Sequence, residues 1–237
     1  MPRPRANLGN PGSWFVMRYD LHTHTLHSDG TLTAPDLVAH AHACGVDALA
    51  LTDHDSTSGI PEASAAAASC GLKLIPGVEI SVTWDGLTVH ILGLGIDTRC
   101  ESLEQGLARL RTFRDWRALE IDRRLRKNRV AGALDYVRAH VRGAIFARTH
   151  FARFLIEHGY VRDMRQAFKR YLGRGASAYV PGQWATLADA VGWIRAAGGV
   201  AVVAHPGRYG LTNAKLTRLL AEFQEYGGRG IEVVSGS

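Results

Sequence analysis

Apolar and polar positions follow two patterns along this chain. Short apolar runs predict strands at 47–51, 72–75, 88–94, 200–204 and 231–234. Apolar residues three and four positions apart predict helices at 33–45, 60–69, 186–197 and 215–226. A further apolar run at 14–17 leads into a first strand, which we expect to be buried and to end near His24. Asp85-Gly86 predicts a tight hairpin turn. Strands that take turns with helices in this way indicate an α/β fold.

The pattern changes between residues 101 and 185. Helical spacing dominates there, over 103–129, 149–158 and 164–172, and nothing alternates as a strand does. The longest of these helices is predicted to have one apolar face, comprising Leu103, Leu107, Leu110, Phe113, Trp116 and Leu119. We therefore divide the chain into a disordered extension (1–16), a first α/β part (17–100), an inserted helical subdomain (101–185) and a second α/β part (186–237).

The first predicted strand carries two histidines. His22 and His24 are two positions apart, so in a strand their imidazoles face the same side. Asp29 follows in the next turn and would add an anionic ligand. Imidazole together with carboxylate suits Zn, Mn or Fe better than Ca or Mg. An edge strand with two exposed histidines would give the same pair, so the remaining strands decide between the two interpretations.

The second and third strands repeat the signal. His54 follows the strand at 47–51 and is a candidate ligand, with Asp53 or Asp55 expected to fix the tautomer of its ring. Glu79 lies inside an apolar run, where a carboxylate is costly unless it is paired or bound to a metal. A buried strand that ends in Asp-His-Asp is hard to explain by packing alone.

Two further histidines belong to predicted strands. His90 lies within the strand at 88–94, and His205 follows the strand at 200–204 directly. Either residue alone would be an ordinary core histidine. Because acidic or histidine residues recur at one predicted strand after another, we favour a shared metal site.

Composition narrows the class of protein. The chain of 237 residues is 46% hydrophobic and 21% charged, as soluble globular proteins are, and it has no apolar run long enough for a membrane helix. It lacks the apolar segment of a signal peptide. Cys44, Cys70 and Cys100 are scattered, which favours reduced, buried or half-buried thiols in a cytoplasmic protein.

The positive charge is concentrated in the helical region. Residues 101–186 contain 18 Lys and Arg against 8 Asp and Glu, whereas the rest of the chain contains 10 against 14. A basic segment beside a histidine-rich body suggests a polyanionic substrate, although a solvated Arg-rich face would have the same composition. Arg148 and His150 begin a predicted helix, which fits either a phosphate clamp or an ordinary helix start. Arg114 and Arg117 share one helix face and could reach the same anion.

Together, these residues resemble the motifs of the PHP (polymerase and histidinol phosphatase) superfamily of metal-dependent phosphoesterases. The matching motifs are Asp20-Leu21-His22-Thr23-His24, Ser28-Asp29-Gly30, Thr52-Asp53-His54-Asp55, Gly77-Val78-Glu79-Ile80, His90 and Ala204-His205-Pro206. The resemblance spans roughly residues 17–237. It implies a distorted (β/α)7 barrel of the TIM type, whose active site lies at the C-terminal ends of the strands.

The resemblance also implies a metal centre. Two or three divalent ions are expected, Mn²⁺ in the first place, with Zn²⁺ or Fe²⁺ as alternatives. The ligands carried over are His22, His24, Asp29, His54, Glu79, His90 and His205, and Glu79 is the best candidate to bridge two ions. The candidate catalytic residues are Asp29, His54, Arg148 and His150, and the candidate substrate-binding residues are Arg114, Arg117 and Arg148. A metal-activated hydroxide would attack phosphorus, and His54 or His150 would be the candidate general acid.

Within the superfamily, the Arg-rich helices and residues 143–151 resemble bacterial nucleoside 3',5'-bisphosphate phosphatases that also act as 5'-to-3' exoribonucleases on short RNA. The expected partner is therefore a nucleotide or short RNA, and nothing predicts a membrane or an obligate protein partner. One alternative is a small-molecule phosphatase of the histidinol-phosphate type, which needs less positive charge. Another is a non-catalytic nucleic-acid-binding module, which needs no intact ligand set.

The resemblance contains one departure. The family usually has a further strand after Glu232 that ends in Asp-x-His and completes the metal sphere, and this sequence stops before it. We therefore expect the C-terminal part of the barrel to be missing.

Overall fold

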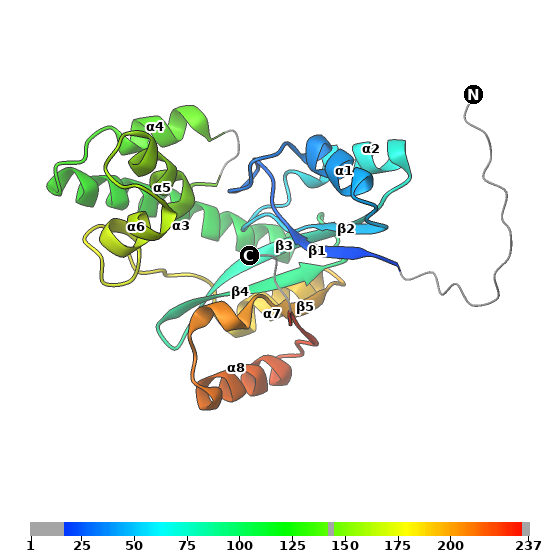
Figure 1. Cartoon of the computed structure of the whole chain (residues 1–237). Coiled ribbons are helices and arrows are strands. Elements are labelled where there is room, and N and C mark those ends of the chain that lie inside the picture. The colour runs from blue at the N-terminus through cyan, green and yellow to red at the C-terminus, as the bar shows by residue number, and fades with distance from the viewer. Residues whose placement is uncertain (1–16, 142–144, 234–237) are drawn as a thin grey trace, which may run out of the picture.

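The computed structural model describes residues 17–141 and 145–233, and its strands form one curled sheet (Figure 1). The six strands, side by side in this order, are β1 (Tyr19–Thr23), β2 (Ala48–Leu51), β3 (Lys73–Trp84), β4 (Leu87–Leu94), β5 (Val200–Val203) and β6 (Gly230–Ile231). β1, β2 and β3 are parallel, β4 is antiparallel to both β3 and β5, and β6 is parallel to β5. The predicted α/β class is confirmed, with β4 as the single reversed strand among those described.

The predicted hairpin joins β3 and β4. Its two turn residues, Asp85 and Gly86, have φ angles of 49° and 71°, and a two-residue turn with both φ positive matches the twist of the strands it connects. β3 runs without a break from Lys73 past Glu79, so the hairpin holds Glu79 and His90 on neighbouring strands.

β1 differs from the expectation of a buried strand. Tyr19 is 54% exposed and Leu21 is 38% exposed, because β1 pairs with β2 along one edge and no other described strand covers it. Residues 14–16 of the apolar run, like the extension proposed for residues 1–16, lie outside the described residues.

Four helices accompany the sheet: α1 (Ala34–Ala43), α2 (Ile60–Cys70), α7 (Leu187–Ala196) and α8 (Asn213–Glu225). The Thr33 hydroxyl caps α1 by accepting a hydrogen bond from the Asp36 N–H at 3.2 Å. α1 and α2 share a core cluster with Leu49 and Leu51 of β2. α7 and α8 contribute to a larger cluster beneath β3, β4 and β5. These helices therefore fix the strands from which the polar residues extend.

The segment between β4 and α7 is helical and has a core cluster of its own. It contains α3 (Glu101–Lys127), α4 (Ala133–His140), α5 (Arg148–Glu157), α6 (Met164–Ala167) and the π-helical turn η1 (Phe168–Leu172). The first turns of α3 bury Leu103 and Leu107 against the sheet, whereas Leu125 joins the second cluster together with Phe151. α3 thus connects the two cores without an interruption (Figure 1).

The predicted apolar face of α3 is wrong beyond Leu110. Trp116 and Leu119 are 51% and 50% exposed, whereas Arg114 and Arg117 are buried. Alternating steps of three and four residues keep a side chain on one face of a helix, and from Leu110 these steps lead to Arg114 and Arg117. Repeated steps of three lead to Trp116 and Leu119 and rotate away from that face.

Two further expectations concern the cysteines and membrane-spanning segments. Cys44 is exposed, contrary to the expectation of a buried or half-buried thiol, whereas Cys70 and Cys100 are half-buried. Among the described helices, none combines the length and the apolar character that a membrane crossing requires.

Candidate metal centre and active-site cleft

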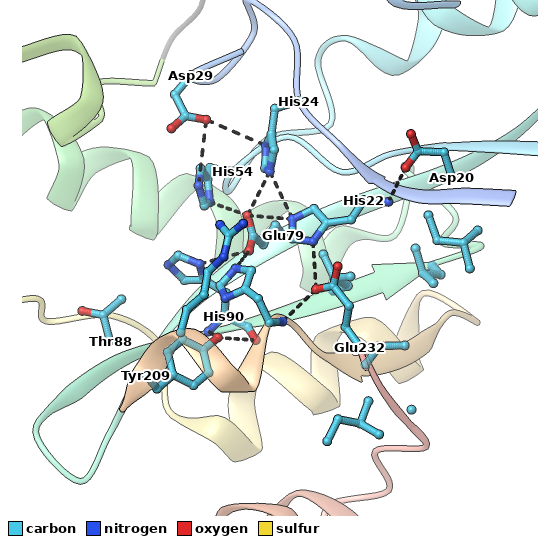
Figure 2. A pocket seen from close by; sticks show the side chains of 18 of the residues that line it. Asp20, His22, His24, Asp29, His54, Glu79, Thr88, His90, Tyr209 and Glu232 are labelled. Carbon is cyan, nitrogen blue, oxygen red and sulfur yellow. Dashed lines mark hydrogen bonds and ion pairs between the residues drawn. The ribbon is translucent and has the colours of Figure 1, made fainter. Parts of the chain in front are cut away.

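Five histidines converge on the carboxylate of Glu79, and Figure 2 labels four of them, His22, His24, His54 and His90. Glu79 is 1% exposed and lies within β3. From Oε2, the distances are 3.4 Å to His22 Nε2, 3.3 Å to His24 Nε2 and 3.0 Å to His54 Nδ1. From Oε1, they are 3.0 Å to His90 Nδ1 and 2.9 Å to His205 Nε2. Six of the seven residues predicted as ligands therefore surround one point.

The strands bring these side chains together because they are close neighbours. His54, three residues after the end of β2, pairs with Glu79 of β3 as an isolated parallel bridge. Gly77 allows this close approach, since a Cβ at that position would come within 3.0 Å of the Leu51 and Gly93 backbone oxygens. β4 then places His90 next to β3, and His205 follows β5.

Asp53 holds the loop that follows β1. Its carboxylate accepts hydrogen bonds from the Thr25 N–H at 2.7 Å, the Thr25 hydroxyl at 2.6 Å and the Ser28 hydroxyl at 2.6 Å. Asp55 accepts a hydrogen bond from the Ser81 N–H at 2.7 Å and forms an ion pair with Arg114. The predicted role of these carboxylates as partners of the His54 ring is therefore corrected: they fix the backbone on both sides of it.

The chemistry of the group fits a bound cation. The buried Nδ1 of His205 has no hydrogen-bond partner in the described structure, and those of His54 and His90 lie 3.0 Å from Glu79 without the angles of a hydrogen bond. His22 Nε2 and His24 Nε2 face each other at 3.1 Å, which is unfavourable for two ring nitrogens unless a proton or a cation lies near both. Imidazole and carboxylate are the donors that Zn, Mn and Fe accept.

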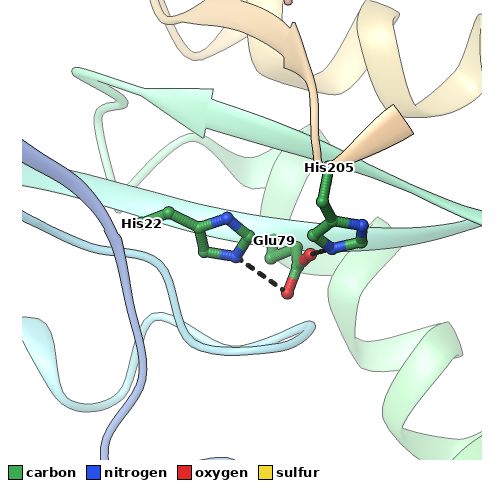
Figure 3. A group of neighbouring side chains, drawn as sticks. All are labelled: His22, Glu79 and His205. Atoms are coloured by element: carbon green, nitrogen blue, oxygen red, sulfur yellow. Dashed lines mark hydrogen bonds and ion pairs between the residues drawn. The ribbon is translucent and has the colours of Figure 1, made fainter. Parts of the chain in front are cut away.

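The donors form two sets that share Glu79. One set is His22, Glu79 and His205 (Figure 3), and the other is His24, His54 and Glu79. Within each set the possible ligand atoms lie within 4.8 Å of one another. A carboxylate has two oxygens, so Glu79 can serve both sets.

Electrostatics keeps Glu79 ionised. Burial alone would raise the pKa of its carboxyl group, but His54 and His90, followed by the hydrogen bonds of His205 and His22, lower this pKa well below its ordinary value. Burial lowers the pKa of the His24 imidazole, but the hydrogen bond and charge of Glu79, with the charges of Asp29 and Asp53, together outweigh burial and raise that pKa to about 9. At neutral pH this raised pKa favours a protonated His24 ring paired with the Glu79 carboxylate.

Asp29 lies at the side of the second donor set. Its Oδ1 is 3.9 Å from His24 Nδ1 and 4.0 Å from His54 Nε2. Burial raises the pKa of Asp29, but His54 and His24, with the hydrogen bond from Thr149, together outweigh this effect and lower the pKa below its ordinary value. From α5, the Thr149 hydroxyl donates to Oδ2 at 3.1 Å and Arg153 Nη2 donates to the Asp29 carbonyl at 2.9 Å. The sequence analysis assigned no role to Thr149 or Arg153.

Glu232 also contacts the centre and was missed as a site residue. Its Oε2 lies 3.2 Å from His22 Nδ1 and accepts a hydrogen bond from the His205 N–H at 2.7 Å (Figure 2). A usable signal existed, because Glu232 is a carboxylate inside the apolar run at 231–234, as Glu79 is inside its own apolar run.

The centre opens into a cavity of about 1190 Å³. The sheet side of this cleft includes Asp29, Glu232 and the five histidines, and η2 (Pro206–Tyr209) adds Arg208 and Tyr209. The helical side contributes Arg148 and Phe168, with the guanidinium carbon 5.4 Å from the centre of the phenyl ring. Burial lowers the pKa of Arg148.

The other predicted residues of the helical region lie away from this cleft. Arg114 donates to Asp55 and Ser81, and Arg117 donates to the Val180 carbonyl at 3.1 Å and 3.2 Å. Both guanidinium groups lie over the Trp184 ring, with Cζ 5.0 Å from the ring centre for Arg114 and 5.1 Å for Arg117. Burial, followed by the charges of Arg148 and Arg114, lowers the pKa of Arg117 to about 9.

His150 is buried beside a separate small cavity. Its Nδ1 accepts a hydrogen bond from the Ala147 N–H at 3.2 Å, and burial lowers its pKa to about 4. Of the four predicted candidates in the helical region, Arg148 is the one that the described structure brings into the cleft.

Known proteins resemble this chain over most of its length. A family model described as PHP domain matches residues 20–227. The chain is 48% identical over 219 residues to a 3',5'-nucleoside bisphosphate phosphatase of Chromobacterium violaceum, covering 92% of this chain and 77% of the relative. It is 44% identical over 221 residues to the 5'-3' exoribonuclease Rnm of Escherichia coli, covering 92% and 75%.

Solved structures also resemble this chain over most of its length. A structure described as an amidohydrolase from Chromobacterium violaceum, with bound sulfate and no metal, superimposes with a TM-score of 0.89 at 47% identity, over 91% of this chain and 76% of the other. A structure from Bifidobacterium adolescentis, whose description proposes a metal-dependent phosphoesterase, gives 0.82 at 30% identity, over 92% and 77%.

Proposed function

The chain belongs to the PHP domain family, whose model matches residues 20–227, and on that premise we propose that it hydrolyses phosphate esters of nucleotides. Two reactions are included: removal of the 3'-phosphate from a nucleoside 3',5'-bisphosphate, and stepwise cleavage of short RNA from its 5' end. Relatives named for both activities cover 92% of the chain. The proposal rests on one observation above all, the five histidines around Glu79 in a cleft that Arg148 also lines.

We propose that the two donor sets hold divalent ions. His22, Glu79 and His205 would hold one ion, and His24, His54 and Glu79, with Asp29 beside them, would hold another. His90 would complete the sphere around the Glu79 carboxylate. We propose Mn²⁺ in the first place, with Zn²⁺ and Fe²⁺ as alternatives that fit the same donors. When bound, such ions would supply Lewis-acid stabilisation of the phosphoryl oxygens and a hydroxide at neutral pH.

Residues of the chain would perform the remaining tasks. Arg148 would neutralise a phosphoryl oxygen as charge develops in the transition state. Phe168, which lies beside it, offers an apolar surface on which a base can stack. Asp29 and His54 line the cleft, and with Nδ1 of His54 directed at Glu79, its Nε2 would be our candidate for protonating the leaving group. His150 is proposed instead to hold the start of α5, because its low pKa and its separate cavity do not suit a general acid.

The proposal extends to the architecture. We propose that residues 17–100 and 186–237 form the catalytic body and residues 101–185 a helical subdomain. The six described strands would be part of a distorted (β/α)7 barrel. That an Asp-x-His after a further strand completes the metal sphere, as the family resemblance implies, stays a prediction. A cytoplasmic location and a nucleotide or RNA substrate, without an obligate protein partner, belong to the same proposal.

Product analysis tests the proposed reaction. The Mn²⁺-loaded protein is incubated in parallel with a nucleoside 3',5'-bisphosphate, a short 5'-phosphorylated RNA and histidinol phosphate. We expect inorganic phosphate from the bisphosphate or 5'-mononucleotides from the RNA, and little product from histidinol phosphate. A Glu79→Gln variant is expected to release none of these products above background.

The outcomes separate the alternatives. Preferential hydrolysis of histidinol phosphate would favour the small-molecule phosphatase. Binding of RNA without any product, in a protein that retains its ions, would favour a binding module. Binding of RNA should weaken steeply as salt rises if several phosphates are contacted, whereas release of phosphate from a mononucleotide should depend on salt much less.

A further inference from the structure

Glu232 contacts two different strand exits at the metal centre. Its side chain follows β6, and its Oε2 lies 3.2 Å from the ring of His22, which belongs to β1. The same oxygen accepts a hydrogen bond at 2.7 Å from the backbone N–H of His205, which follows β5. Figure 2 shows the Glu232 carboxylate directed toward the ring of His22. One carboxylate therefore joins the ends of three strands.

The contact with His22 determines which ring nitrogen can bind an ion. Because Glu232 Oε2 accepts at Nδ1, the proton of the neutral ring is held on Nδ1, and Nε2 is left with a free lone pair. Nε2 is the nitrogen that faces Glu79, at 3.4 Å (Figure 3). Carboxylates that accept from the outer nitrogen of a ligand histidine fix the tautomer and orientation of the ring.

The contact with His205 acts on the backbone. His205 has φ 28° and ψ 56°, in the left-handed region that residues other than glycine adopt rarely. Such conformations persist only where the surroundings hold them. The hydrogen bond from the His205 N–H to Glu232 is one such restraint, and the His205 ring then lies with Nε2 2.9 Å from Glu79.

We propose that Glu232 is a positioning residue for one of the two ion sites, that of His22, Glu79 and His205. Both of its contacts go to histidines of this set. The other set, His24, His54 and Glu79, has Asp29 as its outer carboxylate. The two ion sites thus have separate supporting carboxylates although they share Glu79. This inference rests on the proposed metal centre and goes beyond it by assigning Glu232 to one site.

Metal binding by full-length variants tests this assignment without substrate. Glu232→Leu removes the acceptor at similar size, and Glu232→Gln retains a neutral acceptor oxygen. Ion stoichiometry, titration with Mn²⁺ and the magnetic coupling of neighbouring Mn²⁺ ions are compared with wild type. For Glu232→Leu we expect one ion to bind roughly 10–100-fold more weakly and the coupling to be lost, while the other ion keeps its affinity. Glu232→Gln should have a smaller effect.

Two control variants frame the result. Glu225→Gln, an exposed glutamate of α8, should match wild type. Asp29→Asn should weaken the binding of the ion whose affinity Glu232→Leu leaves unchanged. Thermal melting of the metal-free proteins shows whether each variant is folded, and the near-isosteric Glu232→Gln keeps the test valid if Glu232→Leu does not fold.

The ring of His22 provides an independent readout. In Zn²⁺-loaded wild type, nitrogen NMR should detect a hydrogen-bonded proton on Nδ1 of His22, and this signal should be lost in Glu232→Leu. If Nδ1 carries no proton in wild type, Glu232 does not hold the proposed tautomer of His22 and the proposal fails. Unchanged affinities for all ions in both variants, or an equal loss at both sites, would also overturn it. A wild-type protein that binds no divalent ion would refute the proposed function instead.

Discussion

The sheet and the helical region both bring charged side chains to one cleft, but they hold them differently. The side chains of the sheet come from neighbouring strands and meet at one buried carboxylate, Glu79. The basic side chains of the helical region are divided between two tasks. Arg114 and Arg117 are bound to acceptors of the protein, whereas Arg148 lines the cleft. The number of arginines in the helical region therefore does not identify substrate contacts. The partner of each guanidinium shows whether it supports the fold or lines the cleft.

The division has a structural use. Arg114 extends from α3 to Asp55, which directly follows His54, and it also donates to the Ser81 hydroxyl at 2.9 Å. The helical region thus supports the backbone from which a candidate ligand extends. The sheet supplies the donors for ions, and the helices supply both the support and one wall of the cleft.

The largest effect should come from the residue on which the sheet side depends. Glu79→Gln removes a charged donor that both ion sets share, so we expect ion binding to collapse and phosphate release to fall on the order of 10³-fold or more, beyond what outer-shell changes cause. Metal analysis and initial rates check this expectation. Glu62→Gln, an exposed glutamate of α2, serves as control. A Glu79→Gln protein that retained its ions would break the comparison on the sheet side.

Arg114 should matter for stability. Asp55 is 0% exposed, so Arg114→Met leaves a buried carboxylate without its cation, and loss of one partner of such a pair costs about 3–5 kcal/mol. Urea unfolding of the metal-free protein measures this change. Combining Arg114→Met with Asp55→Asn should cost less than the sum of the two single changes. Arg123→Met removes an exposed guanidinium from Glu120, which Arg124 still contacts, and should leave stability almost unchanged. Equal effects of Arg114 and Arg123 would contradict the distinction between the arginines.

Arg148 should matter for turnover. Arg148→Ala removes a cationic donor from the cleft, and we expect phosphate release to fall by roughly 10²-fold, as is typical when one donor to a developing charge is lost. Ion content and unfolding should stay close to wild type. The exposed Arg165 of α6 provides the control, since Arg165→Ala should be neutral. Equal losses in the two variants would indicate a general effect of positive charge rather than a specific contact.

The sequence predicted the sheet side well for a physical reason. Short apolar runs identify buried strands, and consecutive strands in an α/β fold lie side by side, so polar residues at their ends come together. The convergence of His22, His54 and His205 follows from this rule. Glu232 was missed because the strand predicted at 231–234 placed it inside a strand, whereas β6 ends at Ile231 and leaves Glu232 at the strand exit.

The helical side was predicted less well because its contacts are not local. The spacing of Arg114 and Arg117 established a shared helix face, but the partners Asp55 and Val180 are 59 and 63 residues away in the chain. The buried face of α3 could have been predicted by continuing the steps of three and four from Leu110. The separation of Arg148 from His150 required the structure, since it depends on the packing of α5.

The smallest effect concerns a hydrogen bond between the two regions. Thr149 of α5 donates to Asp29 Oδ2 at 3.1 Å, and Thr149→Val removes this donor while keeping the shape of the side chain. Hydrogen bonds to charged groups contribute about 1.5–3 kcal/mol, and the partial exposure of Asp29 favours the lower end, so we expect roughly a tenfold loss of phosphate release. Ion binding at the His24, His54 and Glu79 set should weaken, and the set with His22 should be unaffected. Thr112→Val, whose hydroxyl donates to a backbone carbonyl of its own helix, is the matched control. If both ion sites respond equally to Thr149→Val, the helical region acts on the whole centre and not through Asp29.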